Sequence, residues 1–138
     1  MSAAVDPDVV DRLLRTPATW AVVGLSTNTA RAAYGVAAYL QRLGHRVVPV
    51  HPSAPTVHGV RGVRRLDELP EPPDVVDLFV NSRIAGGVVD EAVAVGARAV
   101  WLQLGVVDEA AAARARAAGL DVVMDRCPAI EGGRRGLG

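Results

Sequence analysis

The chain alternates between short runs of continuous apolar residues and longer segments in which apolar residues recur every three or four positions. A strand that is covered on both faces has the first pattern, and a helix that packs on a sheet has the second. The runs are rich in β-branched residues, which favours strands over buried helices. They predict strands at residues 20–24, 46–50, 75–80, 99–104 and 120–124.

The segments with helical spacing fill the gaps between these runs. A short helix is expected to start at Asp6 and Pro7 and to end before Pro17, because Asp is a favourable N-cap and proline fits the first turn. Three further helices are expected at residues 34–43, 84–95 and 108–118, the second with Ser82 as a candidate N-cap. Each of the three is followed by a glycine suited to end a helix.

Between residues 52 and 73 only an edge strand at residues 60–64 and a helical turn at residues 66–69 are expected. Strands that alternate with helices favour a parallel sheet with right-handed crossovers. We therefore predict an α/β protein with a Rossmann-like, doubly wound, mostly parallel sheet of five to six strands and helices on both faces. Residues 1–131 are expected to form a single domain. Residues 132–138 are expected to be a flexible tail, because they offer little to bury.

Composition narrows the classes of function. Fifteen basic and fifteen acidic residues cancel, so no overall positive field favours nucleic acid or an anionic membrane surface. The first residues show no export signal, and no apolar run approaches the roughly 20 residues that span a bilayer. A single cysteine excludes an internal disulfide and suits a reducing compartment. We expect a cytoplasmic protein that binds neither nucleic acid nor membranes.

The loop after the first predicted strand contains Gly24, Ser26, Thr27 and Arg31. Ligands of open parallel sheets bind at the carboxyl ends of the strands, near the point where the strand order reverses. Gly24 lets the backbone approach a ligand, the two hydroxyls can donate, and Arg31 can form two parallel charge-assisted bonds with a phosphate. The alternative is an ordinary loop with exposed polar residues. We favour a phosphate site, because the loop opens the first βα unit.

The same loop lacks two nucleotide-binding fingerprints. The positions after Gly24 that a dinucleotide-binding motif fills with glycine hold other residues, and no Gly-Lys-Ser/Thr sequence occurs. The second strand ends at Val50-His51-Pro52, without the acidic residue that binds an adenosine ribose. These observations disfavour ordinary nicotinamide binding and nucleotide hydrolysis. His51 is either a contact for adenine or phosphate or a plain turn residue.

Polar residues also follow the third and fourth predicted strands. Asn81, Ser82 and Gln103 could orient amide groups of a ligand, although Ser82 could equally cap a helix and Gln103 could satisfy the backbone. Arg83 either adds charge for a phosphate or is a solvated residue at a helix start.

The sequence shows no pattern typical of a catalytic or metal site. No histidine has a recognisable Ser or Cys partner, and spacings such as Cys-x-x-Cys or His-x-x-x-His do not occur. Binding is therefore favoured over catalysis, and no metal is expected. Cys127 follows the last predicted strand beside Arg126, which would favour the thiolate. The alternative for Cys127 is an inert, buried thiol.

Over nearly its full length the chain resembles the small CoA-binding proteins that look like a free-standing CoA-binding domain of the succinyl-CoA synthetase alpha subunit. The matching segments are residues 23–28 with Arg31 and Tyr34, residues 48–52, residues 75–79 with Asn81 and Ser82, residues 99–105 and residues 123–131. The last two segments are long and specific. Members of the family often have Pro-Ser where this chain has Ala32-Ala33, and a basic residue at the position of Val80.

The resemblance implies that the cleft holds coenzyme A or an acyl-CoA. The diphosphate would lie over Ser26, Thr27 and Arg31, the adenosine near His51 and Pro52, and the pantetheine arm would pass Val80, Asn81 and Gln103. The alpha subunit of succinyl-CoA synthetase also has a phosphohistidine segment and a ligase domain. Neither has a counterpart in this sequence, so no independent catalysis is expected.

Three alternatives for function, and the assembly of the chain, stay open at this point. The same cleft could serve an NAD(P)-binding redox enzyme or sensor. CoA could form a mixed disulfide with Cys127. The chain could form a homo-oligomer, or it could lend its CoA site to a separate catalytic subunit.

Overall fold

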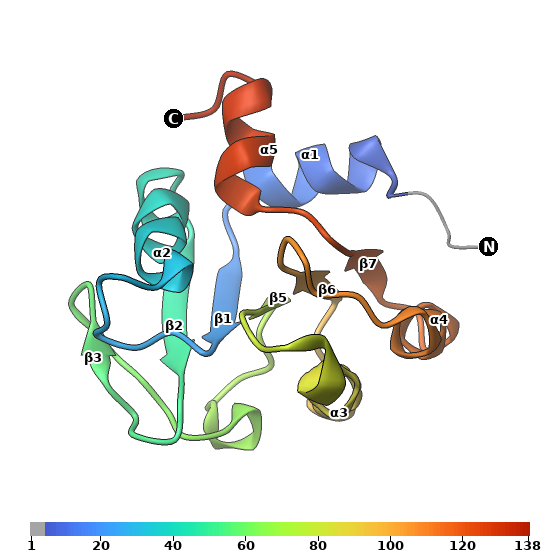
Figure 1. Cartoon of the computed structure of the whole chain (residues 1–138), viewed down its shortest axis with the longest axis horizontal. Coiled ribbons are helices and arrows are strands. Elements are labelled where there is room, and N and C mark those ends of the chain that lie inside the picture. Colours follow the sequence, from blue (N-terminus) through green and yellow to red (C-terminus); the bar gives the residue numbers. More distant parts are fainter. Residues whose placement is uncertain (1–4) are drawn as a thin grey trace.

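The structure, a computed structural model, describes residues 5–138 and has a five-stranded parallel sheet at its centre. The strands are β1 (Thr19–Val23), β2 (Arg46–Val50), β5 (Val75–Leu78), β6 (Ala99–Leu102) and β7 (Asp121–Val123). They lie in the order β2-β1-β5-β6-β7 (Figure 1). All five predicted strands are confirmed, and the third and fourth end two residues earlier than predicted. Those residues belong to the loops at the carboxyl edge of the sheet.

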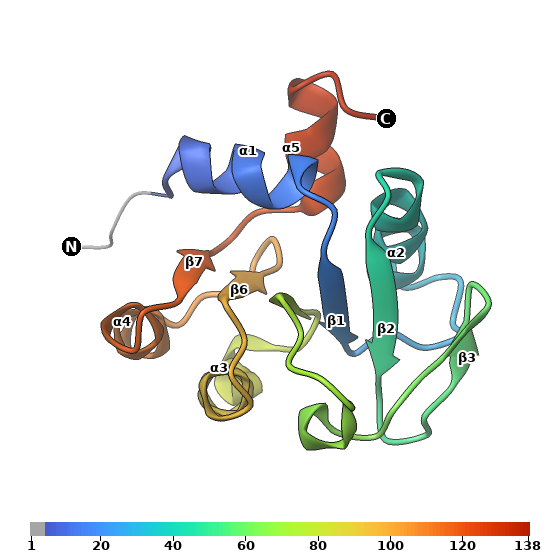
Figure 2. The ribbon, with the colours of Figure 1, turned by 180° about the vertical axis from the view of Figure 1, so that it is seen from behind.

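Helices cover both faces of the sheet, as predicted. Helices α1 (Pro7–Arg15), α2 (Ala32–Arg42) and α5 (Pro128–Arg134) lie on one face (Figures 1 and 2). The other face carries α3 (Ser82–Ala94) and α4 (Glu109–Ala117). The doubly wound, Rossmann-like α/β fold is therefore confirmed.

The two faces of the sheet bury different kinds of side chain. The face under α1, α2 and α5 is built around Trp20 and Trp101, whose ring centroids are 5.5 Å apart. The core between the sheet and helices α3 and α4 consists largely of alanine and valine, including Ala85 of α3 and Ala111 of α4. Since each strand buries side chains on both faces, its sequence shows a continuous apolar run rather than alternation.

Side-chain caps begin three of the helices. Asp6, Asn81 and Asp108 each accept hydrogen bonds from the first-turn amides of α1, α3 and α4. The expectation that Ser82 caps α3 is wrong, because Asn81 occupies the N-cap. Ser82 instead joins α3 to the loop after β6: its hydroxyl accepts from the Val107 amide at 3.0 Å and donates to the Gly105 carbonyl at 3.3 Å.

The connection after β2 is more structured than predicted. The antiparallel pair β3 (Thr56–Val57) and β4 (Val60–Arg61) forms a small hairpin. After it, Val63 pairs in parallel with Val50 at the edge of the main sheet. The expected helical turn is present as the 3-10 helix η1 (Leu66–Glu68).

The expected tail begins inside helix α5, so the prediction that residues 132–138 have little to bury is wrong. Gly132 is buried, and an added Cβ there would meet the Tyr39 hydroxyl. The Tyr39 hydroxyl donates to the Leu137 carbonyl, and the Leu137 side chain packs against the α1, α2 and α5 core. The low hydrophobicity of the segment concealed this docking, which depends on small glycines that let helix α5 approach Tyr39.

His45 ties the segment before β1 to the start of β2. Its ring Nε2 donates to the Leu14 carbonyl at 2.9 Å, and its Nδ1 accepts from the Ala18 amide at 3.2 Å. This arrangement suits the neutral ring, and burial lowers the pKa of His45 below its usual value. His45 is therefore a structural residue of the core.

Within residues 5–138, no helix is long and apolar enough to cross a membrane.

Candidate functional site

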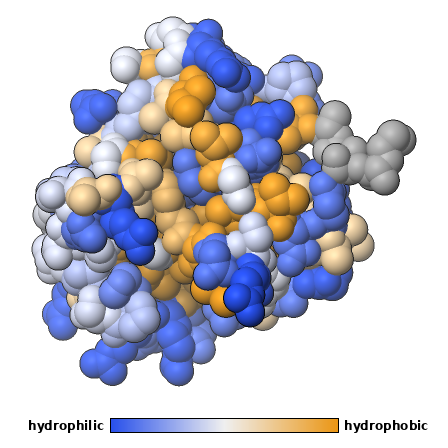
Figure 3. All heavy atoms as spheres, in the orientation of Figure 1, coloured by the Kyte–Doolittle hydropathy of each residue, from blue (hydrophilic) through white to orange (hydrophobic). Residues whose placement is uncertain are grey.

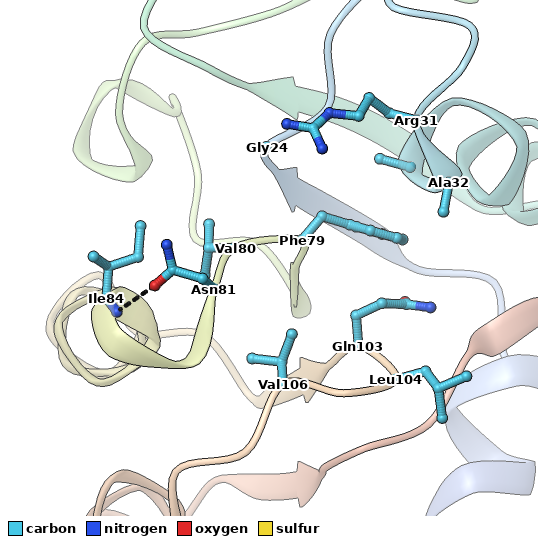
Figure 4. A pocket seen from close by; sticks show the side chains of 11 residues that line it. Gly24, Arg31, Ala32, Phe79, Val80, Asn81, Ile84, Gln103, Leu104 and Val106 are labelled. Carbon is cyan, nitrogen blue, oxygen red and sulfur yellow. Dashed lines mark hydrogen bonds between the residues drawn. The ribbon is translucent and has the colours of Figure 1, made fainter.

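A cleft lies at the carboxyl ends of β1 and β5, two neighbouring strands from which the chain continues to opposite faces of the sheet. From β1 the chain enters α2 on one face of the sheet, and from β5 it enters α3 on the other. Such a switch point leaves a crevice between the two loops. The cleft has a volume of about 660 Å³ and is lined by Gly24, Arg31, Ala32, Ala33, Phe79, Val80, Asn81, Ile84, Gln103, Leu104 and Val106 (Figure 4).

Gly24 forms the turn at the end of β1. Its φ of +96° lies in the region that favours glycine, and an added Cβ would lie 2.3 Å from the Phe79 carbonyl oxygen. The next residue, Leu25, is buried in the core and fixes the start of the loop. Gly24 is thus required by the close approach of two strand ends, in addition to lining the cleft.

The first turn of α2 forms one wall of the cleft. Arg31 is the N-cap residue of α2, and no side chain caps this helix. Ala32 and Ala33 line the cleft beside it, and their small side chains leave the helix N-terminus accessible. The Arg31 side chain extends over the cleft (Figure 4). Amide groups and a guanidinium group at one wall are a favourable environment for a phosphate.

The loop before Arg31 is held by its own side chains. The Ser26 hydroxyl accepts from the Asn28 amide at 3.2 Å, and the Asn28 side-chain oxygen accepts from the Ala30 amide at 3.0 Å. Ser26 and Thr27 are not among the residues that line the cleft. Their expected contacts with a ligand remain predictions.

The opposite wall comes from the start of α3. Val80, Asn81 and Ile84 face the cleft there. The Asn81 side-chain oxygen accepts from the Arg83 amide at 3.0 Å. It also accepts from the Ile84 amide at 3.3 Å (Figure 4). Only the amide nitrogen of the Asn81 side chain is left for a ligand.

Gln103 lies beyond Phe79, at the end of β6. Its side chain is 7% exposed and lines the cleft. Within the described residues, its Oε1 atom is buried without a hydrogen-bond partner. Buried polar atoms are normally paired, so an unpartnered amide oxygen in a cleft indicates a place for a hydrogen-bond donor of a ligand. The expectation that Gln103 could serve only the backbone finds no support in these contacts.

The far end of the cleft is apolar and open to solvent. Ile84 and Leu104 are 54% and 57% exposed, and both line the cleft. Val107, 41% exposed, follows in the same loop as Leu104. Figure 3 shows apolar residues gathered in the middle of this face. The cleft therefore runs from a basic wall to an aliphatic end.

Several predicted site residues lie outside the lining of the cleft. The Tyr34 ring packs against the His58 ring, with centroids 4.3 Å apart. His51 is engaged locally, since its Nδ1 lies 2.9 Å from the Ser53 hydroxyl. Pro52 and Arg83 are exposed. The structure thus brings together Gly24, Arg31, Val80, Asn81 and Gln103, and leaves Ser26, Thr27, Tyr34, His51, Pro52 and Arg83 outside the lining.

Sequence reasoning missed the apolar and small residues of the cleft. Phe79, Ile84, Leu104 and Val106 line it, as do the two alanines of α2. Phe79 and Leu104 fit the apolar runs of the predicted strands, and Ile84 fits the apolar pattern of the predicted helix, so residue type alone did not mark them as cleft residues. Their position near the carboxyl ends of adjacent parallel strands could have indicated that they line the cleft.

Two chemically notable residues lie outside the cleft lining. Cys127 is half-buried at the N-cap of α5 and packs against the α1, α2 and α5 core. Asp77 of β5 is fully buried, and burial raises the pKa of its carboxyl group well above the usual value. Residues 5–138 contain no group of three or more His, Cys, Asp or Glu side chains that could hold a metal ion.

Other proteins share this fold and up to about a third of this sequence. An uncharacterized protein of Bacillus subtilis (strain 168), YneT, is 33% identical over 118 residues, which cover 86% of this chain and 87% of that protein. A solved structure of a hypothetical protein from Pyrococcus horikoshii OT3 is 31% identical, with a TM-score of 0.88 over 95% of this chain and 92% of that one.

A larger protein contains the same fold as one part. The dinucleotide-forming acetyl-coenzyme A synthetase 1 of Ca. Korarchaeum cryptofilum is 22% identical, with a TM-score of 0.71 over 84% of this chain and 28% of that one. At this identity the likeness shows the fold alone. Residues 18–133 match the family model for the CoA binding domain. The chain belongs to the CoA binding domain family.

Proposed function

We propose that this chain binds coenzyme A non-covalently in the cleft between α2 and α3. The observation that carries the proposal is the order of groups along the cleft. Arg31 lies at one wall, the unpartnered Oε1 of Gln103 lies beyond Phe79, and exposed aliphatic residues lie at the end. Coenzyme A has the same order of chemistry, with a diphosphate, an arm containing two amides, and a thiol that can carry an acyl group.

The phosphate end of the ligand is assigned to the first turn of α2. The helix N-terminus and Arg31 supply positive charge there. Asn81 and Gln103 are placed to bond the amides of the pantetheine arm, and Val80 packs against its methylene groups. The thiol end reaches Ile84 and Leu104, whose exposed side chains suit an apolar acyl group.

The lining of the cleft supports binding without independent catalysis. Arg31 is the one ionisable side chain among the described residues that line it. A guanidinium group stays protonated and cannot act as a general base. A catalytic role would therefore require groups from a separate subunit or from a second copy of the chain.

Two alternatives are less favoured. For a nicotinamide cofactor, the end of β2 offers His51, which bonds to Ser53, and no acidic residue for the adenosine ribose. For a mixed disulfide with CoA, Cys127 packs against the core and is not part of the cleft lining.

Coenzyme A is expected to raise the melting temperature of the protein by roughly 5–10 °C at a concentration about 100 times its Kd, because it binds only the folded state. Differential scanning fluorimetry with CoA, NAD, NADP and ATP checks this. A CoA shift no larger than the others would contradict the proposal. Mass spectrometry of ligands that copurify with the protein gives an independent check.

Arg31→Ala is expected to weaken CoA binding about 10- to 100-fold, because it removes charge-assisted hydrogen bonds to a phosphate. Isothermal titration calorimetry measures the change. Arg31→Lys keeps the positive charge but lacks the planar guanidinium group. Its affinity for CoA should therefore lie between those of the unchanged protein and Arg31→Ala. Arg46→Ala is the control, since Arg46 is exposed at the opposite edge of the sheet. Equal affinities of Arg31→Ala and Arg46→Ala would refute the role of Arg31.

Gln103→Leu separates a binding role from a structural one. Leucine removes a buried polar atom that has no partner, so stability should stay constant or rise. CoA affinity should fall about 2- to 10-fold, the worth of one hydrogen bond. Gln41 lies in α2 outside the cleft lining, where its side chain donates to the His58 carbonyl at 3.3 Å. Gln41→Leu is therefore the control for affinity and should leave CoA binding unchanged. A loss of stability with unchanged affinity would show that Gln103 serves the fold only.

A further inference from the structure

A second cavity lies beside β2, next to the connection that follows the β3–β4 hairpin. It has a volume of about 460 Å³ and is lined by Ala54, Arg61, Gly62, Val63, Arg64 and Glu68. Val63 extends the main sheet here, because its amide donates to the Pro49 carbonyl at 2.9 Å and its carbonyl accepts from the His51 amide at 3.0 Å. The two arginines therefore flank a segment that is fixed to the end of β2.

This cavity is close to the cleft and on its basic side. The Gly24 amide donates to the Val50 carbonyl at 2.9 Å, and Val50 pairs with Val63. Neighbouring strands lie about 4.8 Å apart, so Val63 lies roughly 10 Å from Gly24 along the carboxyl edge of the sheet. Gln103 directly follows β6, on the other side of β1 and β5. A ligand with its diphosphate at Arg31 and one arm toward Gln103 would extend its other arm to this cavity.

The cavity has an excess of positive charge. Arg61 and Arg64 are exposed, and neither has an ion-pair partner within residues 5–138. The neighbouring Arg65, in contrast, pairs with Asp67 at 3.1 Å. Glu68 also lines the cavity, and its Oε1 accepts from the amides of Arg64 and Arg65 at 2.9 and 3.0 Å. Two guanidinium groups against one carboxylate leave the cavity cationic.

The backbone between the two arginines is tightly packed. An added Cβ at Gly62 would lie 2.6 Å from the Pro55 carbonyl oxygen and 2.9 Å from the Pro49 carbonyl oxygen. The Gly62 amide donates to the Pro55 carbonyl at 2.8 Å. With Glu68 holding the following residues, the positions from which Arg61 and Arg64 extend are fixed. Such preorganisation lowers the cost of binding an anion.

We propose that Arg61 and Arg64 bind a phosphate monoester on the ribose of the nucleotide whose diphosphate lies at Arg31. In folds of this kind, the end of the second strand meets the adenosine ribose, where an acidic residue binds a free hydroxyl and an arginine accommodates a phosphate. This chain has arginines there and no acidic residue at residues 50–52. The inference rests on the proposed function, for which the phosphate is the 3′-phosphate of CoA.

The test compares CoA with dephospho-CoA, which lacks only that phosphate. Calorimetry should show that the unchanged protein binds CoA more tightly than dephospho-CoA. The double variant Arg61→Ala/Arg64→Ala should bind CoA about 10- to 100-fold more weakly, and dephospho-CoA within about 2-fold of the unchanged protein. Arg65→Ala is the matched control and should change neither affinity. Arg31→Ala should weaken both ligands by the same factor.

Other results of this experiment would overturn either the assignment of the two arginines or CoA binding itself. Equal loss of CoA and dephospho-CoA in the double variant, or equal affinities of the unchanged protein for the two ligands, would overturn this inference while leaving CoA binding in place. Binding of neither ligand would overturn the proposed function. If the unchanged protein binds NADP more tightly than NAD, and the double variant does not, the two arginines bind a ribose phosphate. The ligand of the site would then be NADP in place of CoA. Arg61→Gln/Arg64→Gln repeats the test if the alanine variant does not fold.

Discussion

Gly24→Ala is expected to lower the free energy of unfolding by about 2–6 kcal/mol, a large part of the stability of a domain of this size. Two costs combine. Alanine is strained at a φ of +96°, and its Cβ would lie 2.3 Å from the Phe79 carbonyl oxygen, so the ends of β1 and β5 must separate. Urea denaturation followed by circular dichroism measures the loss.

Two other glycines of the chain separate these costs. Gly35 lies inside α2 with no atom within 4 Å of an added Cβ, so Gly35→Ala should be neutral or stabilising by up to about 1 kcal/mol. Gly44 has a φ of +99° and the same free space, so Gly44→Ala should show the cost of strain alone, about 1–2 kcal/mol. If Gly24→Ala costs no more than Gly44→Ala, the contact with Phe79 is not important for stability.

Much of the fold was predictable because its determinants are local. Continuous β-branched runs, a proline at the start of α1 and glycines after α2, α3 and α4 each act on neighbouring residues, and the corresponding elements are present. The docking of residues 132–138 was not predictable, because it depends on the contact of Gly132 with Tyr39, which lie 93 positions apart in the sequence. A segment rich in glycine can be poor in apolar residues and still pack closely.

In the candidate site, too, features set by neighbouring residues were predictable and features set by packing between distant residues were not. The rule that ligands bind at the carboxyl ends of parallel strands correctly indicated Gly24, Arg31 and Gln103 as residues of one cleft. It could not show that Asn81 caps α3, or that Tyr34 turns toward His58, since both depend on side-chain packing. Nor did residue type distinguish Arg61 and Arg64 from Arg65. That distinction required knowing which arginine side chain forms an ion pair with a carboxylate.

Asp77→Asn is expected to stabilise the protein at neutral and alkaline pH. Asp77 lies in the centre of the sheet, paired in register with Val22 of β1 and Trp101 of β6. Within the described residues, both of its carboxylate oxygens are buried without a hydrogen-bond partner. An ionised carboxylate in this position is costly, whereas asparagine has nearly the same shape and no charge. The gain at pH 8 should be at least about 1–3 kcal/mol.

The sign of the pH dependence follows from the raised pKa. Between the unfolded pKa of 3.8 and the higher folded pKa of Asp77, the folded state holds the proton more tightly than the unfolded state. Stability due to Asp77 is therefore complete below 3.8 and is lost as the pH rises through the folded pKa, at about 1.4 kcal/mol per pH unit. His45 acts in the opposite sense: its folded pKa lies below 6.5, so its contribution is lost as the pH falls.

Comparing Asp77→Asn with the unchanged protein at each pH cancels the contribution of His45, which both share. The two proteins should have nearly equal free energies of unfolding at about pH 4, where a protonated Asp77 resembles asparagine, and should diverge in favour of the variant as the pH rises. Asp90→Asn is the control, because Asp90 is exposed and pairs with Arg114, so its effect should be a small loss. If the difference in free energy of unfolding between Asp77→Asn and the unchanged protein does not vary with pH, Asp77 does not cause the loss of stability at high pH.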